Sequence, residues 1–190
     1  MPVSIEQIAQ DEPEVSFQPG DSYLYSYREF VLYFAGVGEI TSHHLVVGTH
    51  MAYGWMPIIL KLRNVPENMD TAVTLLNAVR HGDTLSVAGL TTLKNLINNS
   101  MVGPSKLLHF INPRSYAIWD RRVCRYLNAD GPPYYQIDSP DSYLAYLKLC
   151  KEISQDSRFP SIHASMNSKI GYTVTAFRAL ELVMFMSSRE

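Results

Sequence analysis

Residues 102–110 read VGPSKLLHF, and residues 118–123 read IWDRRV. The first stretch predicts a tight glycine turn and then a helix, with Ser105 as its N-cap and Lys106 in its first turn. The second stretch sets one carboxylate, Asp120, between a tryptophan and two arginines. An amine and an acid in such apolar sequence suit attack on an electrophilic carbon beside a phosphate. They equally suit a buried ion pair between two helices, and both interpretations stay open at this point.

The sequence on both sides of these stretches predicts an all-α fold. Apolar residues recur at helical spacing in several segments, including residues 21–34 and residues 139–152. No segment shows the alternation that is typical of a strand. We expect about seven to nine helices in a compact, two-lobed domain, with a helix-hairpin-helix-like turn around residues 98–106. We also expect residues 167–187 to form one long helix in the core, and Gly131–Pro133 to interrupt the chain.

The charges are distributed unevenly along the chain. Residues 1–20 are acidic, contain prolines and show little periodicity, which predicts a loosely packed arm before a single domain over residues 21–190. Residues 106–125 contain five Lys or Arg residues and only one acid, Asp120. A local basic surface is therefore expected although the net charge is -2. Such a surface fits phosphate contact, and it also fits a solvated cluster without a function.

Several classes of protein are not indicated by this sequence. There is no apolar run of about 18 residues, so no membrane partner is expected. No basic segment followed by an apolar run begins the chain, and only Cys124 and Cys150 occur. The histidines show no metal-binding spacing. We therefore expect a cytoplasmic protein without a metal or cofactor, in which both cysteines are buried.

Lys106 and Asp120 are the candidate catalytic residues. A lysine at a helix N-terminus, close to arginines, has a lowered pKa and is a better nucleophile. The alternative is a surface lysine whose stem covers an apolar patch. Asp120 suits stabilisation of a developing oxocarbenium ion, and it equally suits a helix N-cap.

Aromatic residues near these two positions are candidates for a base-binding pocket. A base that is flipped out of a duplex stacks on aromatic faces, and Tyr53, Trp55 and Trp119 offer such faces. His109 follows Lys106 by one helical turn and is expected to line the same cleft. A hydrophobic core requires the same residue types, so each of them also has a purely structural interpretation.

The unit from Val102 to Lys106, together with AIWDRRV at residues 117–123, resembles the helix-hairpin-helix DNA glycosylase superfamily over about residues 93–127. The resemblance implies a two-lobed α fold, a DNA substrate and base excision. It implies that amides near Gly103 and Ser105 hold a DNA phosphate. It further implies that Lys106 is the Schiff-base nucleophile and Asp120 the catalytic carboxylate.

The leading hypothesis is a DNA glycosylase, with or without AP-lyase activity, that flips and excises a damaged or modified base from duplex DNA. In this hypothesis Arg121, Arg122 and Arg125 hold the DNA backbone. Two alternatives remain. One is a non-catalytic nucleic-acid-binding module of the same fold. The other is a helical protein-interaction domain in which Lys106 and Asp120 form a structural ion pair.

Overall fold

The computed structural model describes residues 3–18, 20–56, 58–128 and 135–188. The predicted interruption at Gly131–Pro133 lies outside these residues. The described part contains ten α-helices and one short 3-10 helix, η1, and its only β-type pairing is an isolated bridge between Leu62 and Ile97. The prediction of an all-α fold is confirmed. The elements are α1 (Ile5–Asp11), η1 (Glu12–Glu14), α2 (Ser22–Ala35), α3 (Ser42–Gly54), α4 (Val65–Arg80), α5 (Val87–Leu96), α6 (Val102–Ile111), α7 (Arg121–Leu127), α8 (Pro140–Ser154), α9 (Phe159–Ile170) and α10 (Ala176–Ser187).

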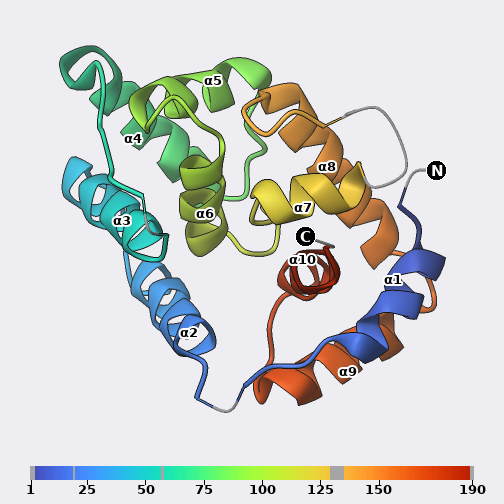
Figure 1. Ribbon diagram of the computed structural model, residues 1–190. Coiled ribbons are helices and arrows are strands. Elements are labelled where there is room, and N and C mark those ends of the chain that lie inside the picture. The colour runs from blue at the N-terminus through green and yellow to red at the C-terminus, as the bar shows by residue number, and fades with distance from the viewer. Residues whose placement is uncertain (1–2, 19, 57, 129–134, 189–190) are drawn as a thin grey trace.

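The helices pack as two groups that share one hydrophobic core. Helices α2 to α6 pack mainly on one another. Helices α1, α7, α8 and α9 pack around α10, which lies near the centre of the molecule and is seen almost end-on in Figure 1. The main direct helix contact between the two groups is that of α5 with α8. This arrangement makes a compact all-α molecule with a boundary between two sets of helices.

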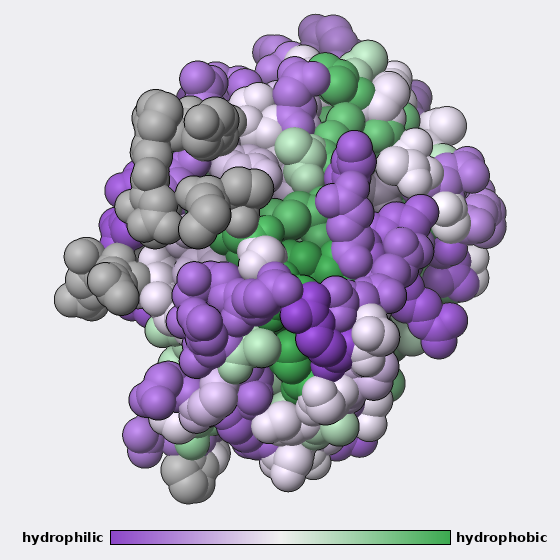
Figure 2. Space-filling view, turned by 90° about the vertical axis from the view of Figure 1, so that its right-hand side faces the viewer, coloured by the Kyte–Doolittle hydropathy of each residue, from purple (hydrophilic) through white to green (hydrophobic). Residues whose placement is uncertain are grey.

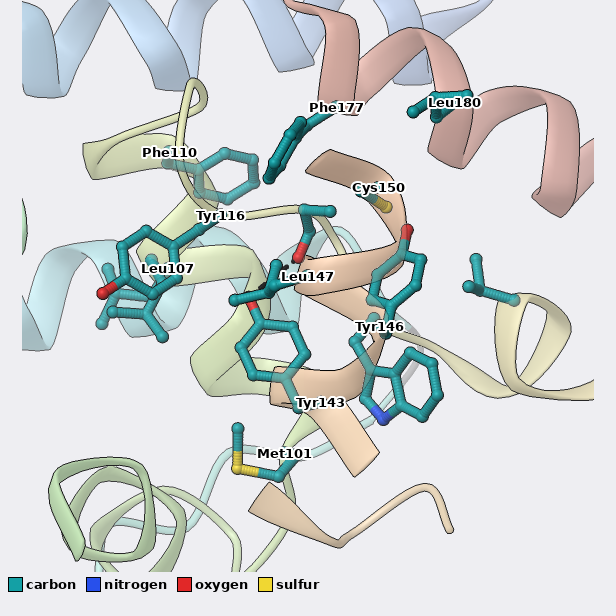
Figure 3. Close-up of a cluster of buried hydrophobic side chains, with 14 of the residues drawn as sticks. Met101, Leu107, Phe110, Tyr116, Tyr143, Tyr146, Leu147, Cys150, Phe177 and Leu180 are labelled. Carbon is teal, nitrogen blue, oxygen red and sulfur yellow. Dashed lines mark hydrogen bonds between the residues drawn. The ribbon is translucent and has the colours of Figure 1, made fainter. Parts of the chain in front are cut away.

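A cluster of buried aromatic side chains joins the two groups. Figure 3 shows Tyr143 and Tyr146 of α8 in the same cluster as Phe110 of α6 and Phe177 of α10. The Tyr143 hydroxyl donates a hydrogen bond of 2.9 Å to the Ala117 carbonyl, so this large side chain is buried with its polar atom satisfied. The segment before α7 is therefore held firmly against α8.

On the face that Figure 2 shows, hydrophilic residues surround a band of hydrophobic ones. Among the described helices, none has the length and apolar content that a bilayer crossing requires.

The predicted long helix over residues 167–187 is wrong, because two helices meet there. Gly171 adopts a left-handed conformation, with φ of 85°, and ends α9. Thr175 then caps α10 by accepting a hydrogen bond of 3.3 Å from the Arg178 amide. The expectation that this segment contributes to the core is confirmed for α10, which is buried from Phe177 to Met184.

The prediction of a loosely packed N-terminal arm is also wrong. Ile5 and Ile8 of α1 are buried, and α1 packs on α10. The Tyr126 hydroxyl donates a 2.6 Å hydrogen bond to Asp11, and Arg158 forms an ion pair with Glu6 at 2.7 Å. The acidic residues of this segment therefore pair with groups on the second set of helices.

Candidate functional site

A cavity of about 940 Å³ lies between the two groups of helices. Its size is near the upper end of the roughly 300–1,000 Å³ that is typical of ligand sites. Its walls come from α2, α3, α6, α7 and α10, from the turn before α6, and from the segments that precede α7 and α8. The lining residues are Phe17, Asp21, Tyr23, Leu24, Tyr53, Trp55, Met56, Ile58, Asn98, Ser100, Val102, Lys106, Ile118, Asp120, Arg121, Arg122, Ile137, Asp138, Arg178, Glu181, Leu182, Phe185 and Met186.

Lys106 lines this cavity and is almost completely buried, with 6% of its surface exposed. It makes no ion pair with any described carboxylate. Burial lowers the pKa of its amine and the charge of Arg178 lowers it further, whereas Asp120 and Glu181 act in the opposite direction. A larger share of the amine is therefore neutral at a given pH than in an exposed lysine, so Lys106 has the character of a nucleophile.

The physical reason for this lowered pKa differs from the one that the sequence indicated. Helix α6 begins at Val102, with Met101 as its N-cap, so Lys106 lies in the second turn. The helix dipole acts most strongly within the first turn. Burial, which the sequence pattern did not reveal, is the main cause.

The predicted phosphate grip at the start of α6 is not supported by the structure. Ser105 is not the N-cap: its amide donates to the Met101 carbonyl at 2.9 Å, and its hydroxyl accepts from the Trp119 amide at 3.0 Å. Gly103 is buried against Tyr53. The carboxylate of Asp138 lies at this helix end and accepts from the Met101 amide at 3.3 Å. A negative charge of the chain itself therefore occupies the place that a phosphate would take.

Gly103 has a structural role, because it lets Tyr53 form part of the cavity wall. A Cβ at this position would lie 2.4 Å from Cε2 of Tyr53. We expect Gly103→Ala to displace that ring and to reduce the free energy of unfolding by about 1–3 kcal/mol. Gly54→Ala is the matched control, because a Cβ there meets nothing within 4 Å. Urea unfolding of both variants tests this expectation, and equal midpoints for the two would contradict it.

Asp120 is the N-cap of α7 and also lines the cavity. Its Oδ1 accepts a hydrogen bond of 3.0 Å from the Val123 amide, so the predicted N-cap role is confirmed. Asp120 and Lys106 share the cavity without forming an ion pair. The interpretation of these two residues as a structural ion pair is therefore wrong.

Of the four residues predicted for a base-binding pocket, two line the cavity and two do not. Tyr53 and Trp55 line the cavity. Trp119 is fully buried in the core, where its indole N–H donates to the Ile137 carbonyl at 2.8 Å. His109 is fully buried as well, outside the cavity wall.

His109 bridges two tyrosines in the core. Burial lowers its pKa to about 3, so the ring is neutral. Its Nδ1–H then donates to the Tyr116 carbonyl at 2.6 Å, and its Nε2 accepts from the Tyr27 hydroxyl at 2.9 Å. Its hydrogen-bonding capacity is used inside the protein, which leaves it a structural role.

Arg178 and Glu181 were not among the site residues predicted from the sequence. They form a buried ion pair on the α10 side of the cavity. The Arg178 guanidinium lies over the Tyr27 ring at 4.5 Å and over the Trp55 ring at 5.4 Å. Burial raises the pKa of Glu181 to about 7. The signal was present in the sequence as two charges three residues apart in the otherwise apolar segment AFRALELVMFM.

The three predicted arginines have different positions. Arg121 and Arg122 are exposed and line the cavity, and the guanidinium of Arg122 lies 4.8 Å from the centre of the Phe185 ring. Arg125 is exposed on α7 but does not line the cavity. The cavity wall as a whole is balanced, because Lys106 and the arginines 121, 122 and 178 are matched by Asp21, Asp120, Asp138 and Glu181.

Within the described part of the chain, no cluster of three or more His, Cys, Asp or Glu side chains could hold a metal ion. Both cysteines are buried and free, as the sequence predicted. Compared with protein-family models, with curated proteins and with solved structures, the chain has no match. The functional proposal that follows therefore rests on the residues of the cavity and on the resemblance in residues 93–127.

Proposed function

We propose that this protein is a DNA glycosylase with AP-lyase activity, in which Lys106 attacks C1′ of a flipped nucleotide and Asp120 assists. The observation that carries the proposal is that the buried, unpaired amine of Lys106 lines the same cavity as the carboxylate of Asp120. An electron-poor carbon is the partner that a partly neutral lysine attacks best.

The cavity also offers what a flipped base requires. Tyr53 and Trp55 are aromatic residues of the cavity wall, and Tyr23, which also lines the cavity, lies against Trp55 with ring centroids 5.5 Å apart. The cavity volume of about 940 Å³ leaves room for a base. Arg121 and Arg122 are exposed on the wall and are suited to contact that backbone.

The chemistry follows from the positions of the two catalytic candidates. Lys106 Nζ forms a bond to C1′ while the bond from C1′ to the base nitrogen breaks, and the base leaves with that electron pair and takes up a proton. The carboxylate of Asp120 stabilises the positive charge that develops on the sugar in this step. Nζ then loses a proton, its lone pair forms the C=N bond while the bond from C1′ to the ring oxygen breaks, and that oxygen takes up a proton, which gives the imine in its protonated form.

Borohydride reduction is the direct test, because it converts such an imine into a stable amine. We expect a covalent adduct between the protein and duplex DNA that carries an abasic site. Salt-sensitive DNA binding without an adduct would instead favour the non-catalytic nucleic-acid-binding module. The absence of both would favour the protein-interaction domain.

Arg121→Ala is expected to weaken DNA binding at every sequence and to lower the slope of log affinity against log salt by about 1. The reason is that an exposed arginine at the cavity binds a phosphate and displaces its counterion. Arg114→Ala is the matched control, since Arg114 is exposed but does not line the cavity. Fluorescence anisotropy over a series of salt concentrations measures both slopes, and identical slopes for the two variants would refute the phosphate role of Arg121.

A further inference from the structure

Glu181 is a carboxylate of the cavity wall that lies on α10, whereas Asp120 caps α7. It is 2% exposed, it lines the same cavity as Lys106, and its Oε2 accepts the hydrogen bond from Arg178 Nη1. Asp120 uses its Oδ1 to cap α7. A second buried carboxylate therefore lines the same cavity as Lys106, at a position that the resemblance to glycosylases did not indicate.

We propose that Glu181 is the proton acceptor for Lys106 during imine formation, and that Arg178 holds its carboxylate in position. This inference rests on the proposed function. Lys106 lies on α6 and Glu181 on α10, and both residues line the same cavity. Their electrostatic influence on each other is mutual, because Glu181 raises the pKa of Lys106 and Lys106 lowers that of Glu181.

The step can be written for an abasic site in its aldehyde form. Lys106 Nζ bonds to C1′, and the π electrons of the carbonyl move to its oxygen. Glu181 takes one proton from the resulting ammonium group and delivers it to that oxygen. After a second proton transfer the oxygen leaves as water, and the nitrogen lone pair forms the C=N bond. Glu181 ends the sequence in the state in which it began, and no oxidant or further reactant is needed.

The surroundings of Glu181 suit such a shuttle. Burial holds its pKa at about 7, while Arg178 and Lys106 lower it and Asp120 raises it. The other titratable groups that sense its charge are Tyr27 on α2 and Tyr146 and Cys150 on α8, and burial raises the pKa of each of them, so they stay neutral. A carboxyl group that is half ionised near neutral pH both accepts and returns a proton readily.

The test is the single-turnover rate of adduct formation with abasic-site duplex, trapped with cyanoborohydride from about pH 5 to about pH 9. For the wild-type protein we expect the rate to rise with pH through about 7, where Glu181 ionises. We expect Glu181→Gln to slow the reaction on the order of 100-fold and to remove that inflection, and Glu181→Asp to restore part of the rate.

A merely electrostatic role for Glu181 predicts a change of the opposite sign. Removal of its negative charge lowers the pKa of Lys106 further, which leaves more neutral amine and speeds the attack. An unchanged or faster rate in Glu181→Gln, with the inflection retained, would overturn the inference. If the wild-type protein formed no adduct at all, the proposed function would fail first, so the two failures are distinguishable.

A control for loss of folding is needed, because Glu181→Gln leaves the buried cation of Arg178 without its partner. Circular dichroism and urea unfolding show whether that variant folds. Where it does not, Arg178→Met is compared with the double variant Arg178→Met/Glu181→Gln, in which both charges are gone. We expect the double variant to react on the order of 100-fold more slowly than Arg178→Met. Equal rates in these two variants would overturn the inference.

Discussion

Replacing Lys106 with methionine is expected to abolish the borohydride-trapped adduct with abasic-site DNA. Methionine keeps an unbranched apolar side chain for the buried part of the wall but has no amine, so the imine cannot form while the fold is kept. The adduct is measured as a shifted protein band on a denaturing gel. Lys148→Met is the matched control, because the Lys148 side chain is 79% exposed on α8, outside the cavity wall.

Both variants are expected to bind DNA with an affinity similar to that of the wild-type protein, because the phosphate contacts belong to Arg121 and Arg122. An adduct that persists in Lys106→Met would show that another amine reacts. The role proposed for Lys106 would then be wrong, whatever the binding affinity.

Replacing Asp120 with asparagine is expected to slow the release of a modified base on the order of 100-fold or more. Asparagine caps a helix about as well as aspartate does, so α7 and the overall stability are expected to be retained. Only the negative charge beside the developing sugar cation is lost. Single-turnover release of the base from duplex DNA measures this effect, and a set of modified bases is screened first with the wild-type protein.

Two comparisons separate the catalytic role of Asp120 from its capping role. Asp120→Ala removes both, and we expect it to lower the free energy of unfolding by about 1 kcal/mol in addition to the loss of activity. Trapping on an abasic site, where no base has to leave, is expected to be affected less than base release in Asp120→Asn. If Asp120→Asn released the base at the wild-type rate, Asp120 would be a helix cap and nothing more.

The parts of the fold that the sequence predicted well are amphipathic helices with clear caps. Asp21, Ser86 and Ser139 each accept a hydrogen bond from an amide in the first turn of the helix that follows. A capping side chain and a regular apolar stripe are both local, so they can be found without knowledge of the partner helices.

The errors arose where tertiary contacts outweigh local pattern. The acidic segment before Val15 has little periodicity, but its Ile5 and Ile8 are buried on α10. Residues 167–187 are apolar enough for one helix, and a single left-handed glycine, Gly171, divides them. Pro160 lies in the first turn of α9, where proline is tolerated.

In the candidate site, too, the sequence predicted local features and missed those that depend on tertiary contacts. The sequence predicted Lys106, Asp120, Tyr53 and Trp55 correctly as cavity residues. It could not separate them from Trp119 and His109, because an aromatic residue has the same sequence signature in a core and in a pocket. Arg178 and Glu181 were missed because they lie more than fifty residues after the motif, and only the packing of α10 brings them to the cavity.

The most direct test of the central claim is to locate the reduced adduct in the chain. The wild-type protein is trapped with borohydride on abasic-site duplex and digested, and the modified peptide is identified by tandem mass spectrometry. We expect the sugar remnant on Lys106 Nζ. A remnant on any other lysine or on the N-terminal amine, or no covalent adduct at all, would contradict the assignment of this cavity as the active site of a lysine-dependent DNA glycosylase.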